Sequence, residues 1–323
     1  MSEQPQLAFS IIRPFGDFPP VIVDEGNYAA FDTATKFANV IRQNASAQLE
    51  HAAIEGALLF RGFPLATAED FDEVVRAFEL EPFTYEQSLS NAVRVNRTER
   101  VFTANEAPPD VEIFLHHEMA QTPVSPRWLF FFCTSAAETG GATPICRSDR
   151  VFADLAERAP MWADTLESLG LRYTTIMPGA TNAGSGQGRS WQATLKADTR
   201  EQAETRLGEL GYTWRWQPDD SLAATSPALP AVKRLADGTK SLYSQILAAR
   251  LGWQNGERAV SLGDGSPLPE GLADLIVSLA ADHTVDVVWQ PGDFAVVDNW
   301  RVMHGRRPFG GNLKREILVA MAA

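Results

Sequence analysis

Apolar and polar positions follow two different periods along this chain. Residues 20–60 fit a strand, a helix and a second strand. Helical spacing of apolar side chains over 31–53 predicts an amphipathic helix: Phe37, Ala38, Ile41, Ala45 and Leu49. The run at 56–63 is apolar and bounded by glycines, which predicts a short buried strand.

The same patterns predict further elements towards the C-terminus. A helix is expected over 68–78, with Thr67 as its N-cap and acidic residues in its first turn. Other helices are predicted at 148–169, interrupted by Pro160, and at 199–210 and 267–281. Strands are predicted at 127–133, 212–216, 285–289, 294–298 and 316–321, with the turn 290–293 forming a hairpin between two of them.

Many short strands with Pro-Gly turns and a few helices indicate a mostly β protein with helical cover, in the α+β class. The strands would form a barrel or sandwich. Nothing resembling a linker divides the chain, so we expect one domain over 1–323. Glycine and serine are frequent in 176–190, which predicts a loop or lid there, within a lid or insert around 176–245.

Composition narrows the function classes. The chain has 323 residues, 45% hydrophobic and 21% charged, as in ordinary globular proteins. Its net charge of -13 weighs against nucleic acid as a partner. No apolar run is long enough to cross a membrane, and the first residues do not resemble a signal peptide, so we expect a cytoplasmic protein. Two cysteines, Cys133 and Cys146, form no disulfide framework, and Cys133 is expected to be buried.

Candidate chemistry lies in two separated clusters. In an extended His116-His117-Glu118, positions i and i+2 point to the same face, so His116 and Glu118 would face together and His117 away. His304, on a strand near the C-terminus, could complete the set. Two histidines and one carboxylate form the facial triad of non-haem Fe(II) oxygenases, which leaves coordination sites for a cosubstrate and O2.

Each of these residues also has a structural explanation. His116 and His117 could be polar residues at a loop edge, His304 a hydrogen-bonded buried histidine, and Glu118 a surface acid. Zinc is a competing metal, because two histidines and a carboxylate also serve zinc hydrolases. Such hydrolases often carry H-E-x-x-H on a helix, a motif that this chain lacks.

A set of motifs in fixed order resembles the Fe(II)/2-oxoglutarate dioxygenases of the taurine dioxygenase and clavaminate synthase-like group. The segments that carry this resemblance are 56–63, 115–119, 140–143, 188–192, 291–293, 298–304 and 304–309. The resemblance extends from about residue 20 to the end of the chain. It implies a double-stranded β-helix, the cupin-like jelly-roll, flanked by helices.

The resemblance also implies roles for particular residues. His116, Glu118 and His304 would hold iron. Thr143 and Arg315 would bind the distal carboxylate of 2-oxoglutarate, since a guanidinium grips a carboxylate with two parallel hydrogen bonds. Alternatively, Arg315 forms a surface ion pair with Glu316 or another acid, and Thr143 caps a turn. Lys314 could compete with Arg315, although it would point to the opposite face of the same strand.

The expected reaction is oxidation of an unactivated C–H bond of a small molecule, with release of succinate and CO2. Related iron halogenases replace the carboxylate ligand by a small residue, so Glu118 favours hydroxylation over halogenation. Desaturation, ring closure and a non-catalytic metal- or small-molecule-binding relative are alternatives.

The motifs at 115–119 and 190–192 look like those of family members that oxidise amino acids in specialised metabolism, free or tethered to a carrier protein. A carrier protein would then be a partner. The candidates for substrate contact are Arg94, Asn105, Glu106 and Arg306, each of which could instead be a surface or supporting residue.

Overall fold

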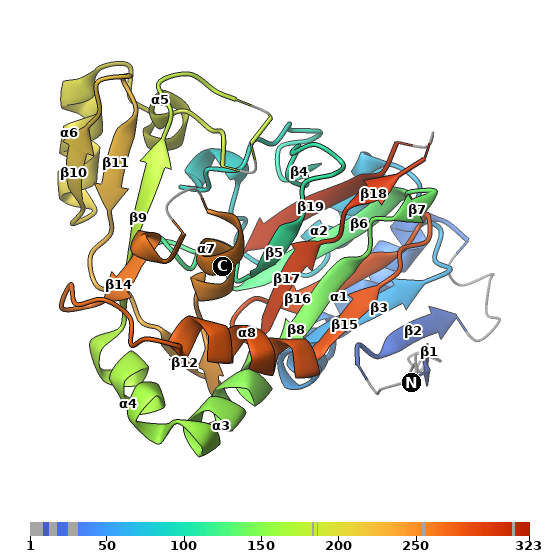
Figure 1. The fold of residues 1–323 in the computed structure, drawn as a ribbon. Coiled ribbons are helices and arrows are strands. Elements are labelled where there is room, and N and C mark those ends of the chain that lie inside the picture. Colours follow the sequence, from blue (N-terminus) through green and yellow to red (C-terminus); the bar gives the residue numbers. More distant parts are fainter. Residues whose placement is uncertain are drawn as a thin grey trace.

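The larger of two facing sheets has seven strands, and the smaller one carries the candidate site (Figure 1). The computed structural model describes residues 9–12, 18–24, 32–182, 184–185, 187–253, 256–311 and 314–323. In spatial order the large sheet contains β1 (Phe9–Ile12), β2 (Val21–Asp24), β3 (Ala57–Arg61), β16 (Phe294–Asp298), β6 (Trp128–Ser135), β19 (Glu316–Ala322) and β4 (Phe102–Thr103). Its neighbours are antiparallel except β2 and β3, which are parallel.

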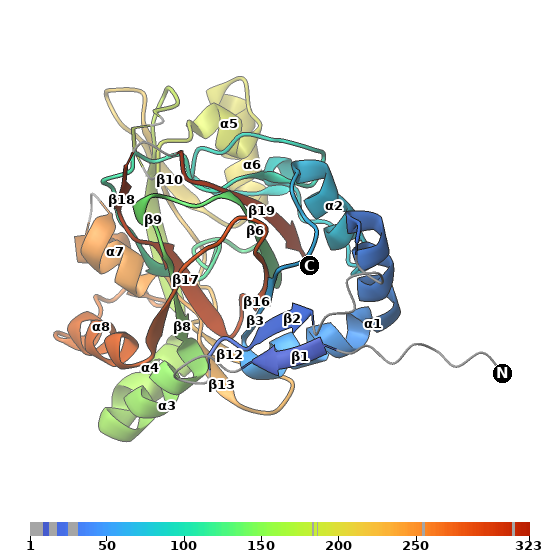
Figure 2. The ribbon, with the colours of Figure 1, turned by 90° about the vertical axis from the view of Figure 1, so that its right-hand side faces the viewer.

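The central strand β6 shows how the large sheet is covered on both faces. Its side chains alternate in direction, as in any strand. Phe130 and Phe132 pack with the apolar faces of helices α1 (Ala34–Glu55) and α2 (Ala68–Arg76). Leu129 and Phe131 point the other way, towards the smaller sheet. Figure 2 shows α1 and α2 along the outer side of the sheet.

The smaller sheet has the order β15 (Thr284–Val287), β8 (Thr143–Arg147), β17 (Val302–Arg306) and β5 (Ile113–His116), all antiparallel. Ile145 and Val302 from this sheet belong to the same apolar cluster as Leu129 and Phe131 of β6. The two sheets therefore share a packed layer, and β5 lies at the edge of the smaller one.

The remaining elements surround this pair of sheets. A third sheet has the order β10 (Thr213–Trp216), β11 (Leu222–Thr225), β9 (Leu171–Met177) and β14 (Val260–Leu262). Two pairs are β12 (Val232–Arg234) with β13 (Lys240–Leu242) and β7 (Thr139–Gly140) with β18 (Phe309–Gly310). The other helices are α3 (Ser148–Arg158), α4 (Pro160–Leu169), α5 (Trp191–Leu195), α6 (Arg200–Glu209), α7 (Ile246–Gly252) and α8 (Leu272–Asp282). The result is a mixed fold of many strands with outer helices.

Most predicted elements are confirmed. Thr67 caps α2 through a capping box, and Pro160 separates α3 from α4 as expected. Both cysteines are buried and free. Among the described residues, no helix is long and apolar enough to cross a membrane.

Two predictions about local structure are wrong. The turn 290–293 is no hairpin, because β15 pairs with β8 in the small sheet whereas β16 pairs with β3 and β6 in the large one. An apolar-turn-apolar pattern does not reveal which sheet each strand joins. The helix expected from 267 begins at Leu272, after Gly271 with a φ of 83°.

Candidate metal centre and cosubstrate cavity

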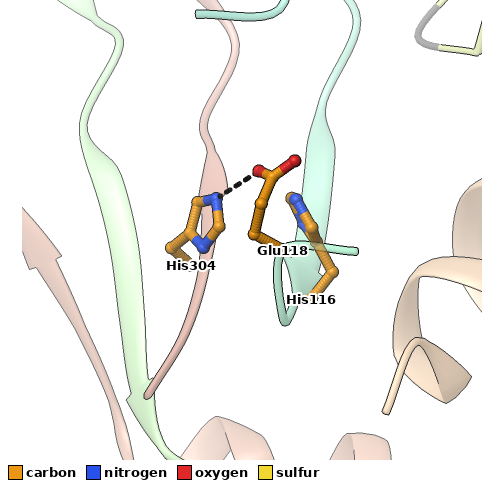
Figure 3. Close-up of side chains that lie close together, drawn as sticks. All are labelled: His116, Glu118 and His304. Atoms are coloured by element: carbon orange, nitrogen blue, oxygen red, sulfur yellow. Dashed lines mark ion pairs between the residues drawn. The ribbon is translucent and has the colours of Figure 1, made fainter. Parts of the chain in front are cut away.

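Two adjacent strands bring the separated clusters together. His304 of β17 lies directly opposite His116 of β5, and their rings are 4.4 Å apart between centroids. Glu118 follows two residues beyond the end of β5. One ligand atom from each of His116, Glu118 and His304 lies within 4.8 Å of the others (Figure 3). The sequence therefore identified three residues that the fold places around one point.

A turn, and not a continued strand, aims Glu118 at this point. The prediction of an extended His116-His117-Glu118 is wrong at its last residue, because β5 ends at His116 and Met119 has a φ of 58°. Asn299 fixes the turn from the other cluster. It accepts a 2.7 Å hydrogen bond from the Glu118 amide and donates a 3.0 Å hydrogen bond to the Glu118 carbonyl.

His117 points away from the metal-facing residues, as predicted, and is fully buried. Its Nδ1 lies 2.8 Å from the carbonyl of Asn299, and its Nε2 lies 2.7 Å from the carbonyl of Leu242 and 2.8 Å from the hydroxyl of Ser148. Burial lowers its pKa well below the usual value, with a contribution from the nearby His304. Both ring nitrogens are engaged, so His117 is a structural residue.

The protonation states of His116 and Glu118 suit a metal ion. Burial lowers the pKa of His116 to about 4, with a further contribution from His304. Its Nδ1 donates a 2.8 Å hydrogen bond to the carbonyl of Phe114, which leaves the Nε2 lone pair free. A neutral imidazole is the form that binds metals.

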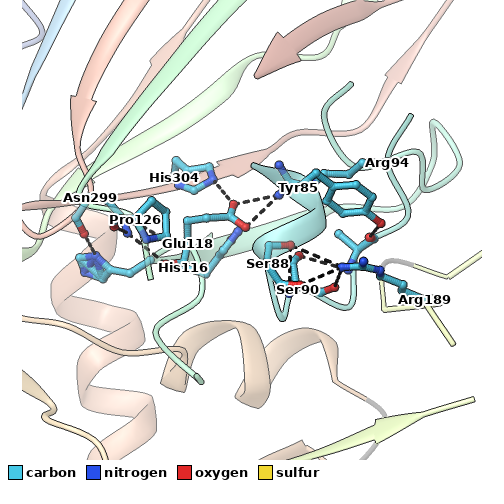
Figure 4. A network of polar contacts seen from close by, with 12 residues as sticks. Tyr85, Ser88, Ser90, Arg94, His116, Glu118, Pro126, Arg189, Asn299 and His304 are labelled. Carbon is cyan, nitrogen blue, oxygen red and sulfur yellow. Dashed lines mark hydrogen bonds and ion pairs between the residues drawn. The ribbon is translucent and has the colours of Figure 1, made fainter. Parts of the chain in front are cut away.

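Glu118 is held as a carboxylate by its surroundings. Burial raises its pKa, but Arg94, His304 and His116 lower it, and the balance is a pKa below the usual value. Nη2 of Arg94 donates to both carboxylate oxygens at 2.9 Å, and both side chains are buried (Figure 4). The donor set therefore has two imidazole rings, from His116 and His304, and one ionised carboxylate, which fits a divalent iron site.

A cavity of about 350 Å³ opens beside these residues. Thr143 and Arg315 belong to its lining. Arg315 donates 2.8 Å from Nε to the carbonyl of Gly141 and 3.4 Å from Nη2 to the hydroxyl of Thr143. Trp289 donates a 2.8 Å hydrogen bond to the same hydroxyl. A side chain at Gly141 would lie 2.9 Å from Cδ of Arg315, so a glycine is needed to admit the arginine.

Arg315 is a partly buried cation without an acidic partner among the described residues. Burial lowers its pKa to about 10, with a contribution from Arg306, so it stays charged at neutral pH. No carboxylate in the described part of the chain forms an ion pair with it, and Glu316 pairs with Arg97 instead. The expected alternative, an Arg315–Glu316 pair, is therefore wrong. The guanidinium fits the carboxylate end of a cosubstrate such as 2-oxoglutarate.

The prediction that Lys314 and Arg315 lie on the same strand is wrong, because β19 begins at Glu316, after both residues. Its side chain is 76% exposed and lies near Glu316. It is therefore a surface residue.

The four candidate substrate residues occupy different positions. Arg94 and Asn105 line the cavity, and the Asn105 side chain accepts a hydrogen bond from the amide of Ala107. Arg306 also lines it, but its guanidinium donates to four backbone carbonyls, those of Asn105, Ala107, Pro108 and Val111. Glu106 is exposed and is absent from the described lining.

Sequence reasoning missed two supporting residues. Asn299, which shapes the Glu118 turn, lies inside the motif at 298–304, so attention to its buried amide could have found it. Trp289, which binds Thr143, carries no signal in the sequence beyond its place at the end of an apolar run.

Two histidines and a carboxylate beside a cavity with an unpaired guanidinium define a mononuclear iron oxygenase class. Comparison with known proteins agrees. Residues 31–321 match the taurine catabolism dioxygenase TauD, TfdA family. The chain belongs to this family and is an Fe(II)/2-oxoglutarate-dependent dioxygenase.

Individual relatives extend the comparison. A clavaminate synthase-like protein of Arabidopsis thaliana is 37% identical over 79% of this chain and 78% of its own. The dapdiamide synthesis protein DdaC of Enterobacter agglomerans is 28% identical over 83% of this chain and 82% of its own. The structure of an asparagine oxygenase in complex with Fe(II), 2S,3S-3-hydroxyasparagine and succinate has a TM-score of 0.56 at 13% identity, covering 91% of this chain and 82% of that one.

Proposed function

We propose that His116, Glu118 and His304 hold Fe(II) in a single domain spanning residues 1–323, whose two facing sheets form a double-stranded β-helix. The observation that carries this proposal is the cluster of three ligand atoms within 4.8 Å, at the edge of a cavity. The cluster joins two strands that are hydrogen-bonded neighbours, so its geometry is held by the sheet itself.

Thr143 and Arg315, which line the cavity, then bind the distal carboxylate of 2-oxoglutarate. The support is the partly buried guanidinium of Arg315, which no described acid neutralises and which lies beside a hydroxyl oriented by Trp289. A dianionic cosubstrate would satisfy this cation, while a neutral one would leave it uncompensated.

Iron with 2-oxoglutarate and O2 supplies the oxidising chemistry that attacks an unactivated C–H bond and releases succinate and CO2. The chain's residues position this chemistry. Asn299 orients Glu118, Phe114 fixes the tautomer of His116, and Arg315 fixes the direction of the cosubstrate. Because Glu118 occupies a ligand position, we propose hydroxylation as the outcome, with desaturation or ring closure as variants of the same oxidation.

The proposed substrate is an amino acid or a derivative of one, free or tethered to a carrier protein. The names of the asparagine oxygenase and of the dapdiamide synthesis protein support this class. We also propose that 176–190 acts as a lid within the insert 176–245. Six described residues of this segment line the cavity: Ile176, Pro178, Asn182, Ser185, Gln187 and Gly188.

An anaerobic titration with Fe(II) and 2-oxoglutarate tests the proposed function. We expect a weak charge-transfer band in the visible spectrum that needs both additions, because the cosubstrate must chelate the iron. Arg315→Met should bind iron but need far more 2-oxoglutarate to give the band. Iron binding without a band in the unmodified protein would contradict the proposed cosubstrate site.

A further inference from the structure

Among the described residues, the side chains of three arginines line the cavity, and two of them have a defined task. Arg306 holds the 105–111 segment through four carbonyls. Arg315 lies beside Thr143 at the proposed cosubstrate end. Arg94 lies directly beside the candidate metal ligands and contacts Glu118.

Arg94 uses only part of its hydrogen-bonding capacity. Both of its contacts with Glu118 come from Nη2. Its Nε is fully buried, so a ligand in the cavity does not reach it, whereas Nη1 is not among the fully buried atoms and makes no hydrogen bond to any residue of the described ranges. The ring of Phe102 lies 5.3 Å from the guanidinium carbon and supports its plane. Nη1 therefore keeps its donors available in a residue of the cavity wall, where a ligand oxygen would add a charge-assisted hydrogen bond.

Charge favours an anion as that ligand. When Glu118 coordinates a divalent ion, much of its negative charge is shared with the metal, and Arg94 loses part of its neutralisation. Two other carboxylates are found in the described wall. Glu112 pairs with Arg307 at 2.9 Å, and Asp219 is exposed and accepts hydrogen bonds from Ser221. Neither forms an ion pair with Arg94.

We propose that Arg94 binds the carboxylate of the substrate while it keeps its contact with Glu118, so that the enzyme oxidises a carboxylic acid anchored beside the metal. This inference rests on the proposed function and narrows its substrate class to free acids. The planar fork of a guanidinium matches a carboxylate in two directions, which an ammonium does not. Anchoring the acid group there would fix which carbon of the substrate faces the metal.

The competing explanation is that Arg94 merely orients Glu118. An orienting role would affect every substrate equally, whereas an anchoring role would affect acids and spare their neutral analogues. The experiment therefore compares the twenty standard L-amino acids with the corresponding carboxamides. The holoenzyme carries Fe(II) and 2-oxoglutarate without O2, and binding is read from the change in the charge-transfer band; succinate release is then measured in air.

The variants are Arg94→Met, Arg94→Lys and, as a matched control, Arg97→Met. Arg97 is three residues away, pairs with Glu316 and lies outside the described cavity lining. We expect at least one acid to bind at least tenfold more tightly than its amide. Arg94→Met should weaken that acid by about 10- to 100-fold and the amide much less, as expected for a charged hydrogen bond. Arg94→Lys should restore part of the loss, and Arg97→Met should resemble the unmodified enzyme.

Three results would overturn the inference: equal binding of acid and amide, no band change with any acid, or an equal loss for both ligands in Arg94→Met. The last result would assign Arg94 to orienting Glu118. A missing Fe(II)/2-oxoglutarate band in the unmodified enzyme would overturn the proposed function itself and this inference with it. The titration with Fe(II) and 2-oxoglutarate therefore tests the proposed function, and the comparison of acid with amide tests the role of Arg94.

Discussion

At the end of β5, two neighbouring histidines lie in different surroundings: His116 faces the cavity (the cavity side), and His117 faces the protein interior (the packed side). His116 has one ring nitrogen bonded to a carbonyl and the other facing the cavity. His117 has both nitrogens engaged by two carbonyls and a hydroxyl, in a fully buried position. Residue type alone does not separate these roles; the number of hydrogen bonds that the fold supplies does.

The same contrast extends to the residues around them. On the packed side, Asn299 satisfies the amide and carbonyl of Glu118 and the carbonyl of Pro126. On the cavity side, Arg94 and Arg315 keep donors or charge that no described acid fully matches. The packed side holds the geometry, and the incompletely satisfied side is where ligands add favourable contacts.

The largest expected effect separates the two histidines by activity. His116→Ala should reduce 2-oxoglutarate-dependent succinate release to background, because it removes a proposed iron ligand, and His304→Ala should do the same. Mn(II) affinity, measured by electron paramagnetic resonance, should fall in parallel. Full activity in either purified variant would remove that residue from the proposed triad.

His117→Ala should act mainly on stability. It leaves one buried carbonyl without its donor and the Ser148 hydroxyl without its acceptor, at a cost of about 1–3 kcal/mol for each unsatisfied group. Urea unfolding of the metal-free protein should show this loss, and His116→Ala should lose less. If the two variants were equally unstable, the distinction between the packed side and the cavity side would not hold.

The comparison also shows how far the sequence leads. The spacing of His116 and Glu118, with a distal histidine, was sufficient to predict the ligand set, although Glu118 reaches its place through a turn that Asn299 imposes from a distant segment. The periodicity of apolar residues predicted most helices and strands. It misplaced the 290–293 connection, because pairing between strands depends on contacts far apart in the chain.

The substrate wall was less predictable for the same reason. Arg94 reaches Glu118, and Arg306 reaches the 105–111 segment, through contacts between residues that are distant in sequence. No local pattern distinguishes an arginine that holds carbonyls from one that faces a cavity. Only the hydrogen-bond partners separate Arg306 from Arg94.

A smaller effect, on the affinity for 2-oxoglutarate, is expected at Arg315. Arg315→Met should raise the dissociation constant of 2-oxoglutarate by about 10- to 100-fold, the usual loss for a charged hydrogen bond, with Mn(II) affinity retained. Lys314→Met is the matched control, since that side chain is exposed. Weaker cosubstrate binding in Lys314→Met, with none in Arg315→Met, would reverse the assignment.

The last effect is a dependence of the unfolding free energy on pH, to which His116 on the cavity side and His117 on the packed side contribute with the same sign. The pKa of His116 in the folded protein is about 4, below the ordinary value of 6.5, so folding favours the neutral ring. As pH falls from 6.5 to 4, the unfolded chain takes up a proton that folded His116 refuses. The metal-free protein should therefore lose up to about 1.4 kcal/mol of unfolding free energy per pH unit from this group.

Urea unfolding of the unmodified protein and His116→Gln, both with chelator, isolates this contribution, because His117 and the carboxyl groups are common to both. The stability difference between the two should be constant above pH 6.5 and shift in favour of His116→Gln below it. Parallel curves down to pH 4 would show that the pKa of His116 is not lowered and that its ring is not held neutral for a metal.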